Sequence, residues 1–595
     1  MQKVTRIFDI LTRYATLYPD KGDAIAGKEN GQWIKYSISE YIENANYISA
    51  ALLTLGIQKG DTIATISSNK PEWNIVDMGI LQIGAVHVPI YPTISESDYK
   101  FILGHSEVQY IFISGKDIFR KIEHILPEIP SIKGVFAFKE TDGTTPYQEC
   151  IELGKKSLNL PQLENIKSEI QSSDIATIIY TSGTTGRQKG VMLTHNNLIS
   201  NFTASARIPY FLDHTSKTVS YLPLCHVYER MLNYVFQYLG MPVYYVESTA
   251  TISENLKEVQ PSIMSTVPRL IEKIYDKIYN GGRKLKGIKK MIFFWALRIA
   301  LRYELDGANG TLYETKRKIA DKLVYSKWRE AFGNKLKIIV SGGAALQPRL
   351  SRVFWAAGVW IIEGYGLTET SPVIAVNNFW DKGVKFGTVG PALQGVQIKI
   401  NDDGEILCKG ENVMKGYFKE PALTLEVIDS DGWFHTGDIG HIEPEGQLKI
   451  TGRKKEIFKT SLGKYISPEL IENKFKESRF IDTIMVIGEN QKFAAALIVP
   501  DFAHLQSWCA IKEIPYTTNA EMVNHPRIKQ RFQKEINKYN KFFGATEQIK
   551  RYELMPSEWS IESSELTASL KLKRNAICSK YKPVIDAIFN IESGE

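Results

Sequence analysis

The N-terminal part of the chain alternates short runs of β-branched residues with longer stretches of helical periodicity. From Asp61, the sequence GDTIATISSNKPEWNIVDMGILQIGAVHVPIY passes from a strand-like run through a polar turn to a helical period and back to an apolar run. The same rhythm returns at IATIIYTSGTTG and at KLKIIVSGGAAL, where the strand-like runs end in clusters of small residues. Such alternation is typical of parallel sheets covered by helices, so the pattern predicts an α/β fold.

Later segments have other patterns of predicted secondary structure. Residues 271–333 are strongly helical and basic and are interpreted as a helical excursion of the same domain. After Gly390 the strands become shorter and are separated by Gly and Asp turns, which indicates a smaller antiparallel β subdomain. Beyond Arg453, strands mix with charged helices as in a separate α+β module. We therefore expect a large N-terminal domain, residues 1–452, and a small C-terminal domain, residues 453–595.

Composition excludes several classes of protein. A chain of 595 residues with 43% hydrophobic and 11% aromatic residues is too apolar to be disordered. The 73 Lys and Arg against 66 Asp and Glu give a formal charge of +7, a mild bias that suits anionic cofactors and predicts no nucleic-acid partner. The five cysteines are scattered without CxxC spacing, and the N-terminus does not have the pattern of a signal peptide. A cytoplasmic protein with reduced thiols is expected.

One segment raises the question of whether the protein contacts a membrane. Residues 289–303, KKMIFFWALRIALRY, form an apolar run between basic ends that is too short to span a bilayer. A buried helix with basic ends is the favoured interpretation. The alternative is a helix lying on a membrane surface, which would make the protein peripheral at the inner membrane surface. The oligomeric state is left open, with a homodimer as one option.

The cluster YTSGTTGRQKG, residues 180–190, has the composition of a phosphate-binding loop. Hydroxyls, glycine amides and cations can all donate to phosphate oxygens. A P-loop requires G-x-x-x-x-G-K-[ST], but Lys189 is followed by Gly190, so the hydroxyl that would hold Mg²⁺ is missing. A different phosphate loop is therefore predicted, between a strand and a helix that begins near Thr194, with the donors Thr181, Ser182, Gly183, Thr184, Thr185, Gly186 and Lys189.

Three further segments follow in order. GYGLTETSP, residues 364–372, comes soon after the turn that contains Gly343 and Ala344, and its carboxylate near a triphosphate would require a divalent ion between them. WFHTGDIG and TGRKKEIFKTSLGKYISPELIE come later in the chain. Together with the first loop, these segments resemble the adenylate-forming enzymes, which include acyl-CoA synthetases, luciferases and peptide-synthetase adenylation domains. The loop differs from the family pattern YTSGTTGxPKG at one fixed position, where Gln188 replaces Pro.

The resemblance implies roles in binding ATP and Mg²⁺. Tyr365 would stack on adenine, Thr368 would contact phosphate, and Glu369 with Thr184 would bind Mg²⁺. Asp438 is similar to the carboxylate that holds the ribose hydroxyls, and Arg453 to the cation beside it. The nucleotide site would also include Gly343, Ala344, Gly364 and Gly366.

The C-terminal part of the family pattern implies a mobile small domain. Lys455 falls at the hinge about which that domain rotates between two half-reactions, and Gly463 at the glycine past which the pantetheine of CoA approaches. Near the C-terminus, ELTASLKLKRNAI resembles the long-chain branch, and Lys571 matches the lysine that acts in adenylation. Lys573 is the alternative.

Substrate class rests on two segments. YLPLCHVYERM, residues 221–231, and the VPRLIEK segment that begins at Val267 resemble elements of long-chain synthetases. In that branch His226 lies by the acyl pocket, and it is expected to shape the pocket rather than act as a base, because a fatty acid is ionised at neutral pH. The implied activity is formation of acyl-CoA from a long-chain fatty acid, ATP and CoA through an acyl-adenylate.

Other functions share parts of this pattern. A fatty acyl-AMP ligase, which feeds a carrier protein, would have the same adenylation motifs, and so would a ligase for aryl or other acids. A peptide-synthetase module is disfavoured because no carrier domain follows. A noncatalytic binding protein would have no reason to keep Thr184, Glu369, Asp438, Arg453 and a C-terminal lysine together.

Overall fold

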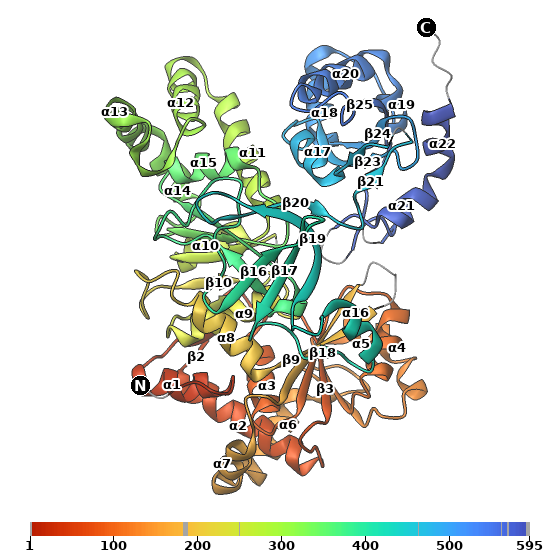
Figure 1. Ribbon diagram of the computed structural model, residues 1–595. Helices are drawn as coiled ribbons and strands as arrows, with labels where there is room; N and C mark the ends of the chain where they lie inside the picture. Colours follow the sequence, from red (N-terminus) through yellow and green to blue (C-terminus); the bar gives the residue numbers. More distant parts are fainter. Residues whose placement is uncertain are drawn as a thin grey trace. The chain divides into compact units, whose positions relative to one another are not determined.

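The computed structural model describes residues 3–182, 188–248, 250–461, 463–560, 562–567 and 571–590 (Figure 1). By its internal contacts the chain divides into two units. Unit 1 comprises Met1–Lys399, Leu407–Thr436 and Ile442–Leu448, and unit 2 comprises Ile400–Ile406, Gly437–His441 and Lys449–Glu595. The boundary at residue 452 that the sequence suggests stays a prediction.

Two eight-stranded sheets, largely parallel, form the centre of unit 1. The first has the order β15 (Val373–Val376), β14 (Trp360–Gly366), β13 (Ile338–Ser341), β12 (Ile263–Thr266), β10 (Thr218–Ser220), β11 (Val243–Tyr245), β1 (Ile25–Glu29), β2 (Gln32–Tyr36). The second has the order β18 (Gly416–Tyr417), β9 (Gln188–Thr194), β8 (Ile175–Ser182), β4 (Val86–Ile90), β3 (Thr62–Ile66), β5 (Tyr110–Ile113), β6 (Gly134–Ala137), β7 (Thr145–Pro146). The pairs β14–β15, β1–β2, β8–β9 and β9–β18 are antiparallel, and the pair β6–β7 at the other edge of the second sheet is parallel.

Both sheets contribute one face to a shared core. In β5, Tyr110 and Phe112 pack into the central cluster, whereas Ile111 and Ile113 pack into a cluster on the other face. Because successive strand residues point to opposite faces, this alternation requires both faces to be covered. The helices that contribute to the central core include α1 (Asp9–Leu17), α2 (Ile38–Thr54), α3 (Pro71–Leu81), α8 (His195–Ser205) and α9 (Val227–Tyr238).

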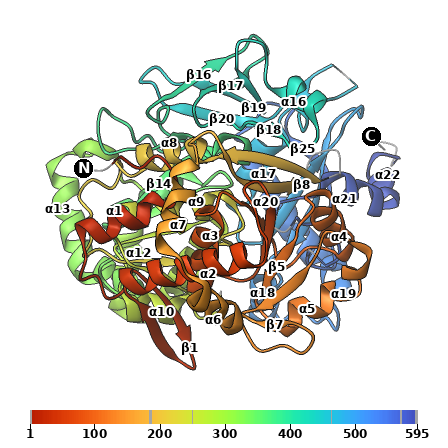
Figure 2. The ribbon, with the colours of Figure 1, turned by 90° about the horizontal axis from the view of Figure 1, so that it is seen from below.

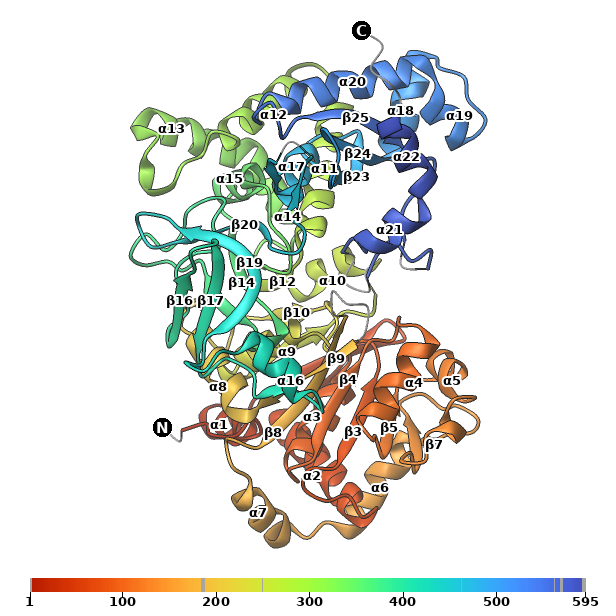
Figure 3. The ribbon, with the colours of Figure 1, turned by 45° about the vertical axis from the view of Figure 1, so that its right-hand side comes forward.

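The remaining helices of unit 1 cover its outer surfaces, as Figures 2 and 3 show from two further directions. Near the second sheet lie α4 (Glu96–His105), α5 (Lys116–Ile122), α6 (Tyr147–Ser157) and α7 (Leu160–Glu169). The predicted excursion is confirmed and comprises α11 (Pro268–Lys284), α12 (Gly287–Ala300), α13 (Gly310–Ala320), the π-helical turn η3 (Asp321–Tyr325) and α14 (Ser326–Glu330). Others are α10 (Ile252–Val259), α15 (Pro348–Ala356), η4 (Thr368–Thr370) and α16 (Pro421–Val427).

A four-stranded sheet follows in the chain, and unit 2 then has its own core. The four-stranded sheet has the order β16 (Val396–Ile400), β17 (Glu405–Gly410), β19 (Phe434–Ile442), β20 (Leu448–Arg453). A hairpin of β21 (Phe458–Lys459) and β22 (Tyr465–Ile466) precedes a sheet of β23 (Ile481–Ile487), β24 (Ala494–Pro500) and β25 (Ile549–Leu554). The helices are α17 (Pro468–Phe475), α18 (Phe502–Lys512), α19 (Asn519–Asn524), α20 (Pro526–Asn540), α21 (Arg574–Lys580) and α22 (Lys582–Asn590). The α/β fold class predicted from the sequence is confirmed.

The apolar run at residues 289–303 is largely internal. Phe293, Ala296, Leu297 and Ile299 on α12 are buried among the other helices of the excursion. The apolar side chains of this run are thus mostly internal, as the favoured interpretation expects, whereas Met291 and the basic residues at its ends are exposed, and contact with lipid stays a prediction. Among the described residues no helix is long and apolar enough to cross a membrane.

Candidate active site

The predicted phosphate loop connects two antiparallel strands. Thr181 at the end of β8 pairs with Lys189 on β9, and Ser182 pairs with Gln188. The predicted helix start near Thr194 is confirmed, since Thr194 caps α8 and the helix begins at His195, but the strand β9 between the loop and this helix was not predicted. The loop residues Gly183, Thr184, Thr185 and Gly186 lie outside the described residues.

Gln188, the departure from the family pattern, has a defined partner. Its side-chain amide donates to Asp98 Oδ1 over 3.2 Å. Asp98 lies in the first turn of α4, where the backbone N–H of Asp98 is capped by Ser95. A side-chain hydrogen bond thus holds the start of β9, where the family pattern has the restricted backbone of proline.

The structure brings Lys189 and Glu369 together through a residue that sequence reasoning missed. The Tyr417 hydroxyl donates to Glu369 Oε1 over 2.9 Å, and Lys189 Nζ lies 5.1 Å from the centre of the Tyr417 ring. Tyr417 reaches this position because β18 pairs with β9 opposite Val191. Burial, and then the nearby Glu369 carboxylate, raise the pKa of Tyr417, so its hydroxyl stays a donor at neutral pH.

The GYG segment forms the end of β14. The antiparallel pairing of β14 with β15 is irregular between Tyr365 and Gly366. A Cβ placed on Gly366 would lie 1.7 Å from the Pro372 carbonyl oxygen, so only glycine fits here. Tyr365 and Thr368 remain partly exposed and can reach a ligand.

Gly343 and Ala344 are exposed at the carboxyl end of the neighbouring strand. They follow β13, which is parallel to β14 and pairs Ser341 with Glu363. Gly343 adopts a φ of +83°, which favours glycine. Because the two parallel strands end side by side, the turn after β13 and the GYG segment border the same edge of the sheet, where ligands bind in open α/β sheets.

His226 caps the start of α9. Its Nδ1 accepts from the backbone N–H of Tyr228 over 3.2 Å, and its ring makes an edge contact with Tyr91. A ring nitrogen used in this way is not available as a base. The geometry is therefore compatible with the expected pocket role and gives no support to a proton-transfer role.

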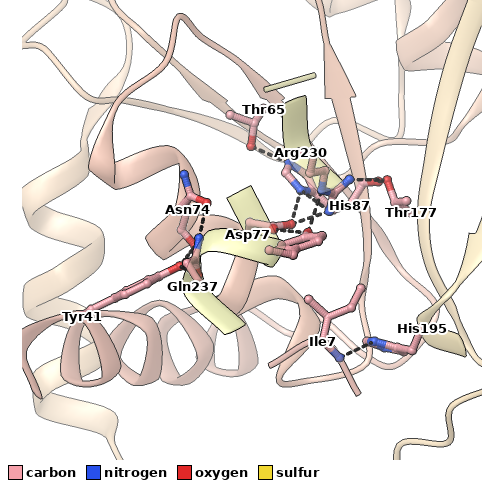
Figure 4. A network of polar contacts seen from close by, with 11 residues as sticks. Ile7, Tyr41, Thr65, Asn74, Asp77, His87, Thr177, His195, Arg230 and Gln237 are labelled. Atoms are coloured by element: carbon pink, nitrogen blue, oxygen red, sulfur yellow. Dashed lines mark hydrogen bonds and ion pairs between the residues drawn. The ribbon is translucent and has the colours of Figure 1, made fainter. Parts of the chain in front are cut away.

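Behind His226, α9 carries a buried polar network that fixes it between the two sheets (Figure 4). Arg230 pairs with Asp77 of α3 over 2.5 Å and donates to Thr177 of β8 over 2.7 Å. On the preceding residue, Glu229 accepts from Ser220 and Ser265 on strands of the first sheet. Burial raises the pKa of Glu229 to about 7.

The predicted ribose carboxylate and its cation form an ion pair in unit 2. Arg453 Nε lies 3.2 Å from Asp438 Oδ1. The Asp438 side chain is only 6% exposed, whereas Arg453 keeps more than a third of its surface. A buried carboxylate with a partly exposed cation beside it can accept hydrogen bonds from ligand hydroxyls without losing its charge partner.

Lys571 belongs to the same group of charges in unit 2. Desolvation, and then the Arg453 guanidinium, lower the pKa of Lys571, whereas the carboxylates of Asp438, Glu469 and Glu456 act in the opposite direction. Lys571 itself is exposed to solvent, so its ammonium can reach an anionic ligand bound beside Asp438 and Arg453.

The other C-terminal residues are placed as follows. Lys573 is the residue before α21, and its backbone N–H donates to Glu565. Lys455 is exposed in the turn after β20. Gly463 is exposed and has a φ of +80°, and among the described residues only Lys459 lies within 4 Å of a Cβ placed there. Glycine is thus favoured at position 463 because of the positive φ angle, and a larger side chain would meet little steric obstruction there.

The donor set near Glu369 fits a magnesium ion held jointly with phosphate. Mg²⁺ usually binds one or two carboxylates and the oxygens of a substrate phosphate rather than a cage of side chains. Tyr417 uses Oε1 of Glu369, and Oε2 can be offered to a cation. Within the described ranges there is no cluster of three or more His, Cys, Asp or Glu side chains able to hold a metal by themselves.

The chain was compared with known protein families. The family model described as AMP-binding enzyme matches residues 11–418, and the model described as AMP-binding enzyme C-terminal domain matches residues 455–593. The fold and these matches define an enzyme class that binds AMP. The chain belongs to the AMP-binding enzyme family.

Curated relatives match over nearly the whole chain. A long-chain-fatty-acid–CoA ligase of Mycobacterium bovis, FadD15, is 32% identical over 95% of this chain and 94% of its own length. Long-chain-fatty-acid–CoA ligase 5 of Rattus norvegicus is 31% identical over 96% and 86%. Among solved structures, an anthranilate CoA ligase, AuaEII, in complex with anthranoyl-AMP is 18% identical and superposes with a TM-score of 0.71 over 98% of both chains. The structural likeness concerns the fold.

Proposed function

We propose that the protein is a long-chain fatty acid:CoA ligase that converts fatty acid, ATP and CoA into acyl-CoA, AMP and diphosphate. The observation that carries the proposal is the 32% identity with a ligase of that name across 95% of this chain and 94% of the relative. The grouping of Lys189 with Glu369, and of Lys571 with Asp438 and Arg453, supplies the charges that such a reaction requires.

In the proposed first step, a carboxylate oxygen of the fatty acid attacks the α-phosphorus of ATP, and the bond to diphosphate breaks. Lys189 and the backbone of the phosphate loop would bind the leaving phosphates, with Thr184 and Thr185 contributing hydroxyls. Asp438 would hold the ribose, and Lys571 would neutralise charge at the α-phosphate and the carboxylate. Preorganised charges of this kind lower the barrier because charge spreads over the reacting oxygens.

In the proposed second step, the sulfur of CoA attacks the acyl carbonyl carbon, and AMP leaves with the electrons of the acyl–oxygen bond. Gly463 would leave room for the pantetheine, and rotation about Lys455 would withdraw Lys571 after the first step. Mg²⁺, held by Glu369 with Thr184, would neutralise phosphate charge when bound. We further propose a cytoplasmic enzyme that contacts a membrane at its surface, where its substrate would accumulate.

The half-reactions separate the role of Lys571 from that of its neighbour. Lys571→Ala should reduce formation of acyl-adenylate from acid and ATP by about 10²–10³-fold, because one charge-stabilising group is lost. The same variant should still form acyl-CoA from supplied acyl-adenylate. Adenylation is followed by exchange of labelled diphosphate into ATP.

Lys573→Ala is the matched control, since it removes the same charge two residues away and should leave both half-reactions near the wild-type rates. If Lys573→Ala loses adenylation and Lys571→Ala keeps it, the assignment of the adenylation lysine is wrong. Release of diphosphate without any consumption of CoA would identify a fatty acyl-AMP ligase instead.

A further inference from the structure

The positive charge of the chain is concentrated in one helical segment. Residues 283–327 contain twelve Lys or Arg and four Asp or Glu. The formal charge of the whole chain is +7, so this segment accounts for all of the excess and the remainder is close to neutral. All twelve basic residues except Arg317 are exposed.

The acidic residues of the segment do not cancel this charge at its surface. Glu304 pairs with Arg352, Glu314 with Arg317, and Asp321 with Arg329. Three of the four carboxylates are thus engaged by arginines, two of which lie outside residues 283–327. The exposed lysines before and within α12 and α13 therefore dominate the local potential.

Large apolar side chains are exposed on the same elements. Six of the sixteen exposed large apolar residues in the described part of the chain lie between residues 288 and 323. Ile288 and Met291 on α12 are 74% and 72% exposed, and Leu312 on α13 is 70% exposed. Monomeric proteins rarely gather exposed apolar side chains in one place unless these contact a partner.

Apolar and basic side chains alternate along α13. Leu312, Lys316 and Ile319 are spaced by four and three residues, which puts them on one stripe of this helix, and Leu323 follows in the π-helical turn η3. Lys318 and Lys322 flank the stripe. Since α12 packs against α13 and η3, the exposed side chains of all three elements belong to one compact projection. Figures 1 and 3 show it at the end of unit 1 opposite α2 and α7.

We propose that this α12–α13 face, defined by Ile288, Met291, Leu312, Ile319 and Leu323 with the exposed cations of residues 283–327, docks on the surface of an anionic lipid bilayer. This inference rests on the proposed function, because a long-chain fatty acid, the proposed substrate, partitions into such a bilayer. Apolar side chains between lysines can enter the interface while the ammonium groups contact lipid phosphates. A nucleic acid would complement the charge but would leave the apolar side chains exposed to water, and an acidic protein partner would be indicated instead if the anionic vesicles were not bound.

The test uses the full chain and phosphatidylcholine vesicles with or without phosphatidylglycerol. Wild-type protein should sediment with the vesicles that contain phosphatidylglycerol, and less so as the salt concentration rises. Leu312→Gln with Ile319→Gln, and separately Lys316→Glu with Lys318→Glu, should each weaken this binding by about tenfold or more. Leu425→Gln, and Lys512→Glu with Lys534→Glu, change equally exposed residues elsewhere and should bind like wild type.

Activity on oleate in neutral detergent micelles separates the two proposals. All variants should keep the wild-type rate there, whereas the variants of the α12–α13 face should lose rate when oleate is supplied in anionic vesicles. Wild-type protein that does not bind the anionic vesicles, or face variants that bind them unchanged, would overturn the docking proposal. If the wild-type protein has no activity on oleate in micelles, the proposed function is overturned instead.

Discussion

Tyr417 joins two groups that the phosphate chemistry needs, the Lys189 ammonium and the Glu369 carboxylate. Tyr417→Phe keeps the ring beneath Lys189 and removes only the hydroxyl that orients Glu369. We expect the rate of acyl-adenylate formation to fall by about tenfold and the Mg²⁺ concentration for half-maximal rate to rise, as loss of a hydrogen bond to a charged group costs about 1.5–3 kcal/mol.

The control is Tyr210→Phe, which removes the hydroxyl of an exposed tyrosine in the same unit. Both variants are compared by Mg²⁺ titration of the diphosphate exchange rate. An unchanged Mg²⁺ dependence in Tyr417→Phe would separate Tyr417 from the metal site.

Glu229 makes stability depend on pH. Its pKa is about 7 in the folded protein and 4.5 in the reference state, because burial disfavours the carboxylate. The folded state therefore binds more protons than the unfolded state between these values, and stability falls as pH rises from about 4.5 to 7. The free energy of unfolding lost over this range is roughly 3 kcal/mol.

Glu229→Gln removes the titrating group and keeps one carbonyl oxygen as an acceptor, whereas the wild-type carboxylate accepts from Ser220 at Oε1 and from Ser265 at Oε2. Relative to wild type, the variant should gain most of this free energy of unfolding between pH 5 and pH 8, measured by urea denaturation at each pH. An equal difference at both pH values would show that Glu229 does not titrate in this range.

At the residue scale, the motifs of the sequence pointed to the charged residues of the candidate site. They did not point to Tyr417, which contacts both Lys189 and Glu369. Asp438, Arg453 and Lys571 were each assigned from short motifs, and the structure places these three in one group. Tyr417 belongs to none of the sequence motifs. Its position depends on the pairing of β18 with β9, which lies more than 200 residues earlier in the chain. Pairing over such a separation is not encoded in local periodicity.

At the element scale, α9 is held by charge as well as by packing. Arg230 and Asp77 are both fully buried, and Tyr234, His87 and Thr177 complete the network (Figure 4). Arg230→Met leaves the Asp77 carboxylate buried without its cation. We expect the free energy of unfolding to fall by about 3–5 kcal/mol, measured by urea denaturation.

The matched variant removes both charges. Arg230→Met combined with Asp77→Asn should be less destabilised than Arg230→Met alone, because no uncompensated charge remains. Simple addition of the two single effects would contradict a coupled pair.

Elements with strong periodicity were predicted well, and their junctions were not. The βαβ rhythm from Asp61 corresponds to β3, α3 and β4, and the basic helical excursion is confirmed. The helix start near Thr194 is confirmed, but the strand β9 that precedes it was missed, because β9 forms by pairing with β8 and with β18. Both pairings are tertiary contacts that override a local pattern.

At the scale of the whole molecule, the excess of positive charge lies on other elements than the candidate phosphate and nucleotide residues. The candidate phosphate and nucleotide residues of unit 1 lie at strand ends and on the adjoining turns, whereas the excess of positive charge lies on the helices around α12 and α13. Two consecutive family models match residues 11–418 and 455–593, and the division into two domains at residue 452 stays a prediction. The acyl pocket could not be predicted, because apolar residues that line a pocket and those that fill a core have the same composition.

The most direct test of the central claim is conversion of ATP to AMP by the purified protein with CoA, across acids from acetate to oleate together with aromatic acids. The account predicts CoA-dependent AMP formation that is greatest with long-chain acids, with one acyl-CoA formed per AMP. A preference for acetate or for an aromatic acid, or no AMP formation with any acid, would contradict it.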